Sequence, residues 1–363
     1  MSSEPDEVRY SFEYEHRVRV GFVGAGGHAF RNVYPAFRYA PVELVAVADL
    51  QLARAQAYAR QFGAERAYAD HRAMFAAERL DAVFIVTGYT PDGRVQATDI
   101  ALDALAAGLH VWMEKPTAAS VAEVEQLIAA RDKAGRIVMT GLKKLFFPTI
   151  AKVKEIIARP EFGAPTSIYV RYPQAIPRLA NRADPLKMLG LLDHIYHPGA
   201  ILDHLMGPIE RFSYEWEPKT GSSVASLRFA SGAVGVLHLA AGASGSSPLE
   251  RLEVVGVGAN VVVENGAKLT YHRLAKRPAY GRSASFLVAD EEAPLVWEPE
   301  FSLGQLNNNS LFLLGYAQEV RHFCDCVLAG TEPDRGTLQQ SLAIMRLFEA
   351  YRRTEPGVSV PIS

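Results

Sequence analysis

Residues 17–29 read Arg-Val-Arg-Val-Gly-Phe-Val-Gly-Ala-Gly-Gly-His-Ala. The stretch begins with alternating residues and then becomes apolar, which predicts a strand that enters a buried sheet. The glycine pattern GxGxxA follows at once and leads into a helical segment, whose free amides attract phosphates. Gly24 permits a tight turn, Gly26 lets the backbone approach a pyrophosphate, and Ala29 lets the helix pack on the strand. An ordinary turn is the alternative. The residues expected at this cofactor turn are Gly24, Gly26, Gly27, His28 and Ala29.

A second apolar strand, over residues 43–48, supports the nucleotide interpretation because it ends in an acid. Asp49 follows Gly24 by about 25 positions, near the ~20-residue distance expected for the acid that binds an adenosine ribose. A carboxylate there accepts hydrogen bonds from the ribose hydroxyls and repels a 2′-phosphate, so NAD is expected rather than NADP. Asp49 can also cap the helix expected over 51–61, and both roles are compatible.

Strand and helix patterns continue to alternate up to residue 141. A strand over 81–87 ends at Thr87, which is expected to border the cofactor. This order predicts an α/β domain of the Rossmann type, a doubly wound parallel sheet with right-handed crossovers. The remaining elements expected in it are a helix over 97–107, a strand over 109–113, a helix over 121–134 and a strand over 136–141.

The strand over 109–113 runs directly into Glu114, Lys115 and Pro116. Ligands of open α/β sheets bind where the strands end, so Glu114 and Lys115 are expected beside the cofactor and Lys115 beside the substrate. A surface turn is the alternative. Glu114 is expected to hold the turn and Pro116 to fix the exit of the chain, with a cis bond as one possible form.

Length, charge and cysteine content bound the function. With 363 residues and a net charge of -2, the chain has room for about two domains and no field that attracts nucleic acid or anionic membrane. Cys324 and Cys326 stand two apart on an expected helix and do not favour a mutual disulfide, which fits a cytoplasmic location. Residues 1–16 form a polar tail without the apolar core of a signal peptide, and no later segment has the ~20 uncharged residues of a membrane span.

Beyond residue 141 the regular alternation of strand and helix patterns ends. Several strands follow one another between residues 212 and 263 without intervening helices, after a first strand over 166–172. They predict an α+β domain, over 142–363, with a large open and mostly antiparallel sheet; the first domain covers 17–141. Residues 268–305 are expected to form a long excursion with little regular structure. Helices are expected over 149–158, 191–206, 312–328 and 338–353.

A second group of chemically active residues lies in Leu-Leu-Asp-His-Ile-Tyr-His-Pro-Gly, residues 191–199. Asp193 and His197 are four apart and share one face of a helix. Pro198 disfavours the helical conformation for His197 and argues against a regular helix at this point. An imidazole with a carboxylate in reach can transfer protons, and two satisfied polar residues at a domain interface are the alternative.

Metal binding is weighed for the same region because several possible ligands crowd there. Their spacing is neither HExxH nor another zinc pattern, and no cysteine supports them, so no metal is expected. These possible ligands are Asp193, His194, His197, Asp203 and His204.

Over about residues 17–362 the chain resembles the glucose-fructose oxidoreductase and inositol dehydrogenase family (Gfo/Idh/MocA). The likeness rests on the glycine turn, on Asp49 at the end of Val-Ala-Asp, on Glu-Lys-Pro after the 109–113 strand, on Asp-x-x-x-His over 193–197, and on the closing residues 348–362. It implies a Rossmann domain, a second domain whose exposed sheet commonly forms homodimers or homotetramers, and a small-molecule substrate. It also implies NAD(P)-dependent oxidation or reduction of a carbinol or carbonyl in a sugar or cyclitol.

By motif position, the resemblance makes Lys115, Asp193 and His197 the expected catalytic set. Lys143 and Lys144 stand where relatives often carry a basic pair, and these five residues are expected to contact substrate. A solvated turn is the alternative for the basic pair.

Three departures from the family pattern bear on the site. The loop over 87–96 is longer than in relatives and lacks their histidine. Ala200 replaces an acid in His-x-x-Asp, and Ile195 replaces the glycine of Asp-x-Gly-x-His. They make the transfer of any one relative's substrate unsafe.

The hypothesis from the sequence is that His197 removes a hydroxyl proton as hydride leaves, Lys115 stabilises the alkoxide, and Asp193 orients His197. One alternative is an enzyme that retains its NAD through oxidation and re-reduction, with net elimination, epimerisation or glycoside cleavage. The other is a non-catalytic regulator that binds the cofactor.

Overall fold

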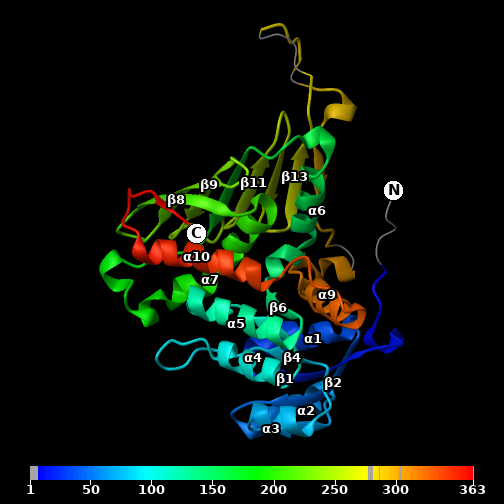
Figure 1. The fold of residues 1–363 in the computed structure, drawn as a ribbon. Coiled ribbons are helices and arrows are strands. Elements are labelled where there is room, and N and C mark those ends of the chain that lie inside the picture. Colours follow the sequence, from blue (N-terminus) through cyan, green and yellow to red (C-terminus); the bar gives the residue numbers. More distant parts are fainter. Residues whose placement is uncertain (1–6, 277–280, 286, 302–304, 363) are drawn as a thin grey trace. The chain divides into compact units, whose positions relative to one another are not determined.

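The computed structural model describes residues 7–276, 281–285, 287–301 and 305–362, so the start of the expected polar tail lies outside the described residues. The chain forms two compact units, each built from segments distant in sequence (Figure 1). The first comprises Met1–Phe146 and Gly315–Met345, and the second Phe147–Leu314 and Arg346–Ser363.

The first unit contains a six-stranded sheet in the order β3-β2-β1-β4-β5-β6, with every neighbouring pair parallel. All four residues of β4 are buried, because helices cover both faces of a doubly wound sheet. The predicted fold class is confirmed here, although β3 and the helix after it were not predicted. The strands are β1 (Val18–Val23), β2 (Val42–Ala48), β3 (Arg66–Tyr68), β4 (Ala82–Ile85), β5 (His110–Glu114) and β6 (Val138–Gly141).

The helices of this unit follow the expected alternation, and α5 matches its expected range. The segment after the glycine turn is an irregular run of η2 (Ala29–Val33), α1 (Tyr34–Ala36) and η3 (Phe37–Tyr39). Figure 1 shows α4 and α5 side by side. The other elements are η1 (Ser11–Glu13), α2 (Leu52–Phe62), α3 (His71–Ala77), α4 (Gln96–Ala106), α5 (Val121–Ala134), η4 (Lys143–Phe146) and α9 (Tyr316–Ala329).

Helix α9 belongs to the first unit although it lies late in the sequence. It packs against η3, η4 and α1. Phe323 of α9 meets the ring of Phe84 edge-on, with ring centroids 5.3 Å apart, and Phe84 stacks on Trp112 at 5.2 Å. Burial of such large side chains contributes about 1.5–3 kcal/mol each, so this late segment is part of the core.

The second unit contains a nine-stranded sheet in the order β14-β13-β12-β11-β7-β10-β9-β8-β15. Only β10 and β7 pair in parallel, which confirms a mostly antiparallel sheet. Burial alternates strictly along β9, so one face packs on a core and the other is exposed. The strands are β7 (Ser167–Tyr172), β8 (Ile209–Trp216), β9 (Ser223–Phe229), β10 (Val234–Leu239), β11 (Arg251–Val255), β12 (Asn260–Glu264), β13 (Lys268–His272), β14 (Leu295–Trp297) and β15 (Val360–Pro361).

The helices of the second unit include α6, which contacts β12, and α7, which contacts β7. Helix α10 begins in the first unit and ends in the second. In the described part of the chain, no helix has the length and apolar character needed to cross a membrane. The elements are α6 (Pro148–Ile157), η5 (Pro160–Phe162), η6 (Leu179–Asn181), α7 (Pro185–Met206), η7 (Asp290–Glu292), η8 (Leu306–Asn308), α8 (Ser310–Leu313) and α10 (Leu338–Arg353).

Two expectations for this unit are wrong. Helix α7 confirms the helix expected over 191–206, but the interruption expected at Pro198 is absent. Losing one backbone donor costs less than exposing the buried face of the helix, which includes Ile195 and Leu202 at 0% exposure. The excursion over 268–305 contains β13 and β14, since alternating Leu269 and Tyr271 are buried on the sheet. Part of that excursion, residues 277–280, 286 and 302–304, lies outside the described residues.

Candidate active site

The glycine turn connects β1 to the helical run that starts at η2. Gly24 has a φ of +110°, and a Cβ there would stand 1.9 Å from the carbonyl oxygen of Val86. Only glycine fits this position. A Cβ at Gly26 or Gly27 would meet no described atom within 4 Å, so open space lies in front of both backbones. The turn therefore offers the close approach that a pyrophosphate needs.

Asp49, just after β2, ties the turn to the neighbouring strand. Its Oδ2 accepts a hydrogen bond from the amide of Ala25 at 2.9 Å, and its Oδ1 accepts one from the amide of Gln51 at 2.9 Å. Gln51, and not Asp49, is the N-cap residue of α2. Each carboxylate oxygen has a second lone pair for ribose hydroxyls, so the positioning of Asp49 suits NAD.

A cavity of about 510 Å³ lies along the carboxyl ends of β1, β2 and β4. It has the size of a small-molecule site. Of the residues expected to bind cofactor, Gly24, Gly26, Asp49 and Thr87 line it. Arg54 lines it as well, and its guanidinium donates to the side-chain oxygen of Gln51.

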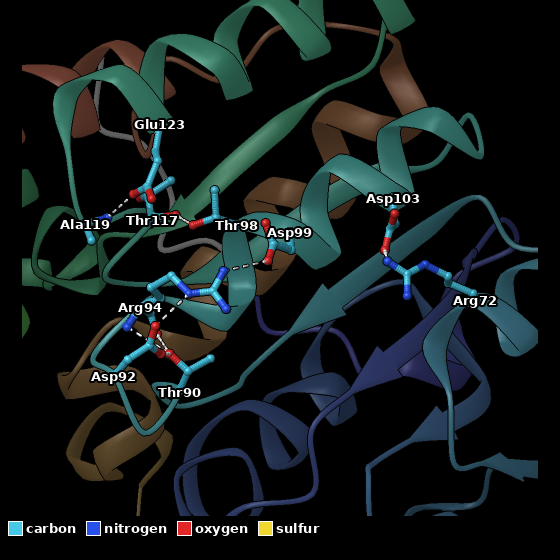
Figure 2. Close-up of polar contacts among 10 residues, drawn as sticks. All are labelled: Arg72, Thr90, Asp92, Arg94, Thr98, Asp99, Asp103, Thr117, Ala119 and Glu123. Carbon is cyan, nitrogen blue, oxygen red and sulfur yellow. Dashed lines mark hydrogen bonds and ion pairs between the residues drawn. The ribbon is translucent and has the colours of Figure 1, made fainter.

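The loop after β4 forms another wall of this cavity and folds back on itself (Figure 2). Tyr89 and Val95 form an isolated antiparallel bridge. The hydroxyl of Thr90 donates to Asp92, and Nε of Arg94 donates to Asp92 at 3.2 Å. The loop over 87–96 is thus closed by its own side chains.

Sequence reasoning missed the ion pairs at the far rim of the cavity. Oδ2 of Asp103 on α4 lies 2.8 Å from Nε2 of His71 on α3. The same oxygen lies 2.8 Å from a guanidinium nitrogen of Arg72, also on α3 (Figure 2). All three residues line the cavity. Because α3 was not predicted, its His71 and Arg72 had no expected neighbour.

At the end of β5, the bond between Lys115 and Pro116 is cis. Thr117 follows, with its hydroxyl 3.1 Å from that of Thr140 and 3.0 Å from that of Ser341. The carbonyl of Thr117 accepts from the hydroxyl of Thr98 at 3.0 Å (Figure 2). These buried contacts fix the chain just after Lys115, as a site on a rigid element requires.

Glu114, the last residue of β5, faces the glycine turn. Its Oε2 lies 3.5 Å from Nε2 of His28. A Cβ at Gly141 would stand 2.8 Å from the same oxygen, so β6 carries a glycine where the carboxylate packs. Glu114 and His28 thus connect the two motifs that the sequence placed separately at one sheet edge.

The basic pair after β6 is buried or partly buried. Lys144 is 6% exposed, and the amine of Lys143 donates to the hydroxyl of Tyr316 at 2.9 Å. Burial lowers the pKa of Lys143; the charges of Glu114 and Glu319 raise it, and those of Lys144 and Lys115 lower it. This geometry differs from the solvated turn that was the alternative interpretation.

Sequence reasoning also missed Tyr316 and Glu319 of α9, which lie one helical turn apart beside Lys143. Burial raises the pKa of both, and the charge of Glu114 raises each further. Gly315, with φ +74°, permits α9 to approach, because a Cβ there would stand 2.6 Å from the carbonyl oxygen of Lys143. A glutamate on the apolar face of a predicted helix was the signal available in the sequence.

In the second unit, Asp193 and His197 lie one turn apart on α7 and are both partly buried. Oδ2 of Asp193 is 3.6 Å from Nδ1 of His194. The ring of Tyr172 lies 5.8 Å from that of His197, centroid to centroid. Burial raises the pKa of Tyr172, as do the charges of Glu250 and Asp193. Within the described residues, no three histidine, cysteine or acidic side chains gather as a metal site would require.

The comparisons with known proteins agree with this geometry. Residues 18–142 match the GFO/IDH/MocA oxidoreductase family with its NAD-binding Rossmann fold, and residues 150–262 match the family's C-terminal domain. The chain belongs to the GFO/IDH/MocA family. Its first unit accordingly contains an NAD-binding Rossmann domain.

Curated relatives of this family include two sugar or cyclitol enzymes. The D-xylose 1-dehydrogenase (NADP(+)) 2 of Haloferax volcanii is 32% identical over 167 residues, which cover 46% of this chain and 50% of that protein. The scyllo-inositol 2-dehydrogenase (NAD(+)) of Bacillus subtilis is 25% identical over 338 residues, covering 88% and 89%. With several curated relatives, the xylose dehydrogenase among them, the chain matches about half of their length or less.

Solved structures show the same fold. An oxidoreductase from Agrobacterium radiobacter, in complex with NAD+, L-tartaric acid and magnesium, superposes with a TM-score of 0.76 at 17% identity. The match covers 95% of this chain and 98% of that one. A dehydrogenase from Chromobacterium violaceum reaches the same TM-score at 21% identity, with 93% and 94% covered.

Proposed function

We propose that this protein is an NAD-dependent oxidoreductase that moves hydride between nicotinamide and a carbinol or carbonyl carbon of a sugar, cyclitol or related polyol. One observation carries the proposal: the glycine turn, Asp49 and the Glu114-Lys115 pair lie together at the carboxyl ends of the strands of one sheet. Asp49 and Glu114 each contact the glycine turn. The family relatives that act on xylose and inositol support the substrate class.

The bound cofactor supplies the hydride acceptor, and the protein supplies the remaining chemistry. In this proposal Gly26, Gly27 and His28 bind the pyrophosphate and Asp49 binds the ribose. Thr87 lines the cavity beside the cofactor. Ala29, which is 0% exposed, lets the helical run pack on β1.

Proton handling is assigned to three residues from the two units. His197 accepts the hydroxyl proton of the substrate, Asp193 orients His197, and the ammonium of Lys115 stabilises the oxygen as its negative charge develops. Lys143 and Lys144 are assigned to the substrate side, where Lys143 acts from its contact with Tyr316. In reduction of a carbonyl the same proton returns from His197.

The domain roles are part of the proposal. Residues 17–141 hold the cofactor, and residues 142–363 bind substrate and form a homodimer or homotetramer through the exposed face of the sheet. Val224 and Val234, 47% and 52% exposed on neighbouring strands, support this surface. The buried free Cys324 and Cys326 are consistent with the reducing conditions of the cytoplasm.

Substitution of Lys115 tests the assignment. Lys115→Met removes the charge while keeping a similar apolar stem, so turnover of a responsive polyol is expected to fall at least ~100-fold, or about 2.7 kcal/mol in the barrier, with NAD affinity changed little. The measurement is the absorbance of reduced nicotinamide with a panel of sugars, cyclitols and amino sugars, together with an NAD titration.

Lys133→Met, an exposed change on α5, is the matched control and is expected to behave as wild type. Near-normal turnover in Lys115→Met would remove this residue from the mechanism. Conversion of a substrate without accumulation of reduced nicotinamide would instead indicate an enzyme that retains its cofactor.

A further inference from the structure

Glu319 is a carboxyl group that the mechanism above does not use. Its side chain is 0% exposed, and neither carboxyl oxygen has a hydrogen-bond partner among the described residues. An ionised carboxylate in such a place costs several kcal/mol unless it is paired. A neutral carboxylic acid avoids most of this cost.

The groups around Glu319 come from several elements packed against α9. Burial and the charge of Glu114, at the end of β5, raise the pKa of Glu319, and the charge of Lys143 of η4 lowers it. Tyr316, one turn earlier on α9, already accepts a hydrogen bond from Lys143. The charge of Arg31 of η2 also acts on Tyr316 and lowers its pKa, against the larger effect of burial.

A charge count within this group favours a stored proton. If Glu319 were ionised, its carboxylate and that of Glu114 would both act on the ammonium of Lys143, whose own pKa burial and the neighbouring charges of Lys144 and Lys115 lower. Glu114 already lies 3.5 Å from Nε2 of His28. Repulsion between two neighbouring carboxylates in a low-dielectric interior favours protonation of one of them. Of the two carboxyl groups, Glu319 is the fully buried one, so its protonation removes the larger desolvation cost.

The group lies at the half of the sheet where a nicotinamide ring belongs. Asp49 and the cavity mark the adenosine half at β1 and β2, whereas Glu114 and Lys143 follow β5 and β6. A nicotinamide ring carries a positive charge when oxidised and none when reduced. Loss of a positive charge near a buried carboxyl raises its affinity for a proton.

We propose that Glu319 stores a proton whose binding is coupled to the oxidation state of the nicotinamide cofactor. When hydride, with its two electrons, leaves the substrate carbon for the ring, the positive charge of the ring disappears and Glu319 takes one proton from solvent. When the cofactor is reoxidised, the same O–H bond of Glu319 breaks and the proton returns to solvent. The inference rests on the proposed function only in requiring a nicotinamide cofactor.

Proton counting by calorimetry tests the proposal on the full-length protein. NAD+ and NADH are titrated separately in buffers of different ionisation enthalpy, from about pH 6 to about pH 9, where buried glutamates titrate. In the wild type, NADH is expected to bind with more protons taken up than NAD+, by up to about one proton per site. In Glu319→Gln this difference is expected to disappear, and in Glu125→Gln, an exposed control on α5, to persist.

An equal proton difference in Glu319→Gln, or none in the wild type, would overturn the proposal. A second readout needs no variant: infrared difference spectra of the wild type with each cofactor are expected to show a protonated carboxyl band that grows on reduction, and an unchanged band contradicts the proposal. Failure to oxidise any polyol, with cofactor binding and proton counts as expected, would count against the proposed function alone.

Discussion

At the scale of single residues, Asp49 does two jobs with one carboxylate. It accepts backbone hydrogen bonds from Ala25 and Gln51, and it stands where ribose hydroxyls are expected. Hydrogen bonds to a charged group are worth about 1.5–3 kcal/mol. Because each carboxylate oxygen has two lone pairs, Asp49 can bind the backbone of the turn and the cofactor at the same time. The sequence distance from Gly24 identified Asp49, but the bond to Ala25 becomes visible only in the structure.

Asp49→Asn keeps one acceptor oxygen and removes the charge. We expect NAD affinity to fall about tenfold, or ~1.4 kcal/mol, and the preference over NADP to shrink because repulsion of a 2′-phosphate is lost. Parallel titrations with NAD and NADP measure both effects. Asp184→Asn, which alters a similar backbone contact at the start of α7, serves as the control and should leave both affinities unchanged.

At the scale of the element, two glycines of the same turn are expected to have different roles: Gly24 is needed for stability and Gly26 for cofactor binding. Gly24→Ala places a methyl group against the carbonyl of Val86 at a φ that side chains rarely adopt. We expect the free energy of unfolding to fall by about 3 kcal/mol or more. Gly26→Ala enters open space, so its stability should stay within about 1 kcal/mol of wild type.

Cofactor binding should show the opposite pattern, because the substitution that leaves stability unchanged is the one that obstructs the cofactor. Gly26→Ala obstructs the approach of a pyrophosphate and is expected to weaken NAD binding at least tenfold in a folded protein. Urea unfolding and NAD titration of the two variants provide the comparison. Equal stability losses in both would mean that the turn is not held as the contact to Val86 indicates.

Element boundaries were predictable where one pattern dominated. Strands β1, β2 and β5 and helix α5 were expected close to their observed ranges, because buried strands are apolar throughout and Gly135 ends α5 with φ +59°. The short β3 and α3 were missed, since only Met74 of α3 is buried and the apolar signal is weak. Pro198 misled because sequence rules weigh its missing amide without the packing of α7.

At the scale of the whole molecule, two titratable groups of the first unit, the buried Glu319 and the partly buried Lys143, make the free energy of unfolding depend on pH. The folded-state pKa of Glu319 is raised by burial above its ordinary value of 4.5. Its contribution to stability is therefore complete below that value and declines as pH rises toward the raised value, because only the unfolded chain releases the proton. The lowered pKa of Lys143 acts in the opposite sense, at more alkaline pH.

Glu319→Gln removes this titration while keeping the shape of the side chain. As pH rises above 4.5, the ordinary pKa of a glutamate, the wild type is expected to lose stability with a slope of up to ~1.4 kcal/mol per pH unit, and the variant with a shallower slope. Urea unfolding at several pH values measures both slopes. Parallel slopes would show that Glu319 is ionised in the folded protein.

Much of the site could be predicted from sequence, but the parts that depend on distant segments could not. Glu114, Lys115 and the glycine turn belong to one run of alternating elements, so their common sheet edge followed from topology. Tyr316 and Lys143 are 173 positions apart, and local patterns carry no information on such a contact. Whether Lys115 and His197 act on one substrate stays a prediction for the Lys115→Met experiment.

That same separation has a consequence for biosynthesis. The ribosome releases β1–β6 early, yet α9, which supplies Phe323 to their core, emerges only after eight strands of the second sheet, β7 to β14, have been made. At roughly 5–20 residues per second, the interval between Lys143 and Tyr316 lasts on the order of 10 s. During that time Phe84 lacks its contact with Phe323, and we expect the apolar surface left open there to bind a chaperone.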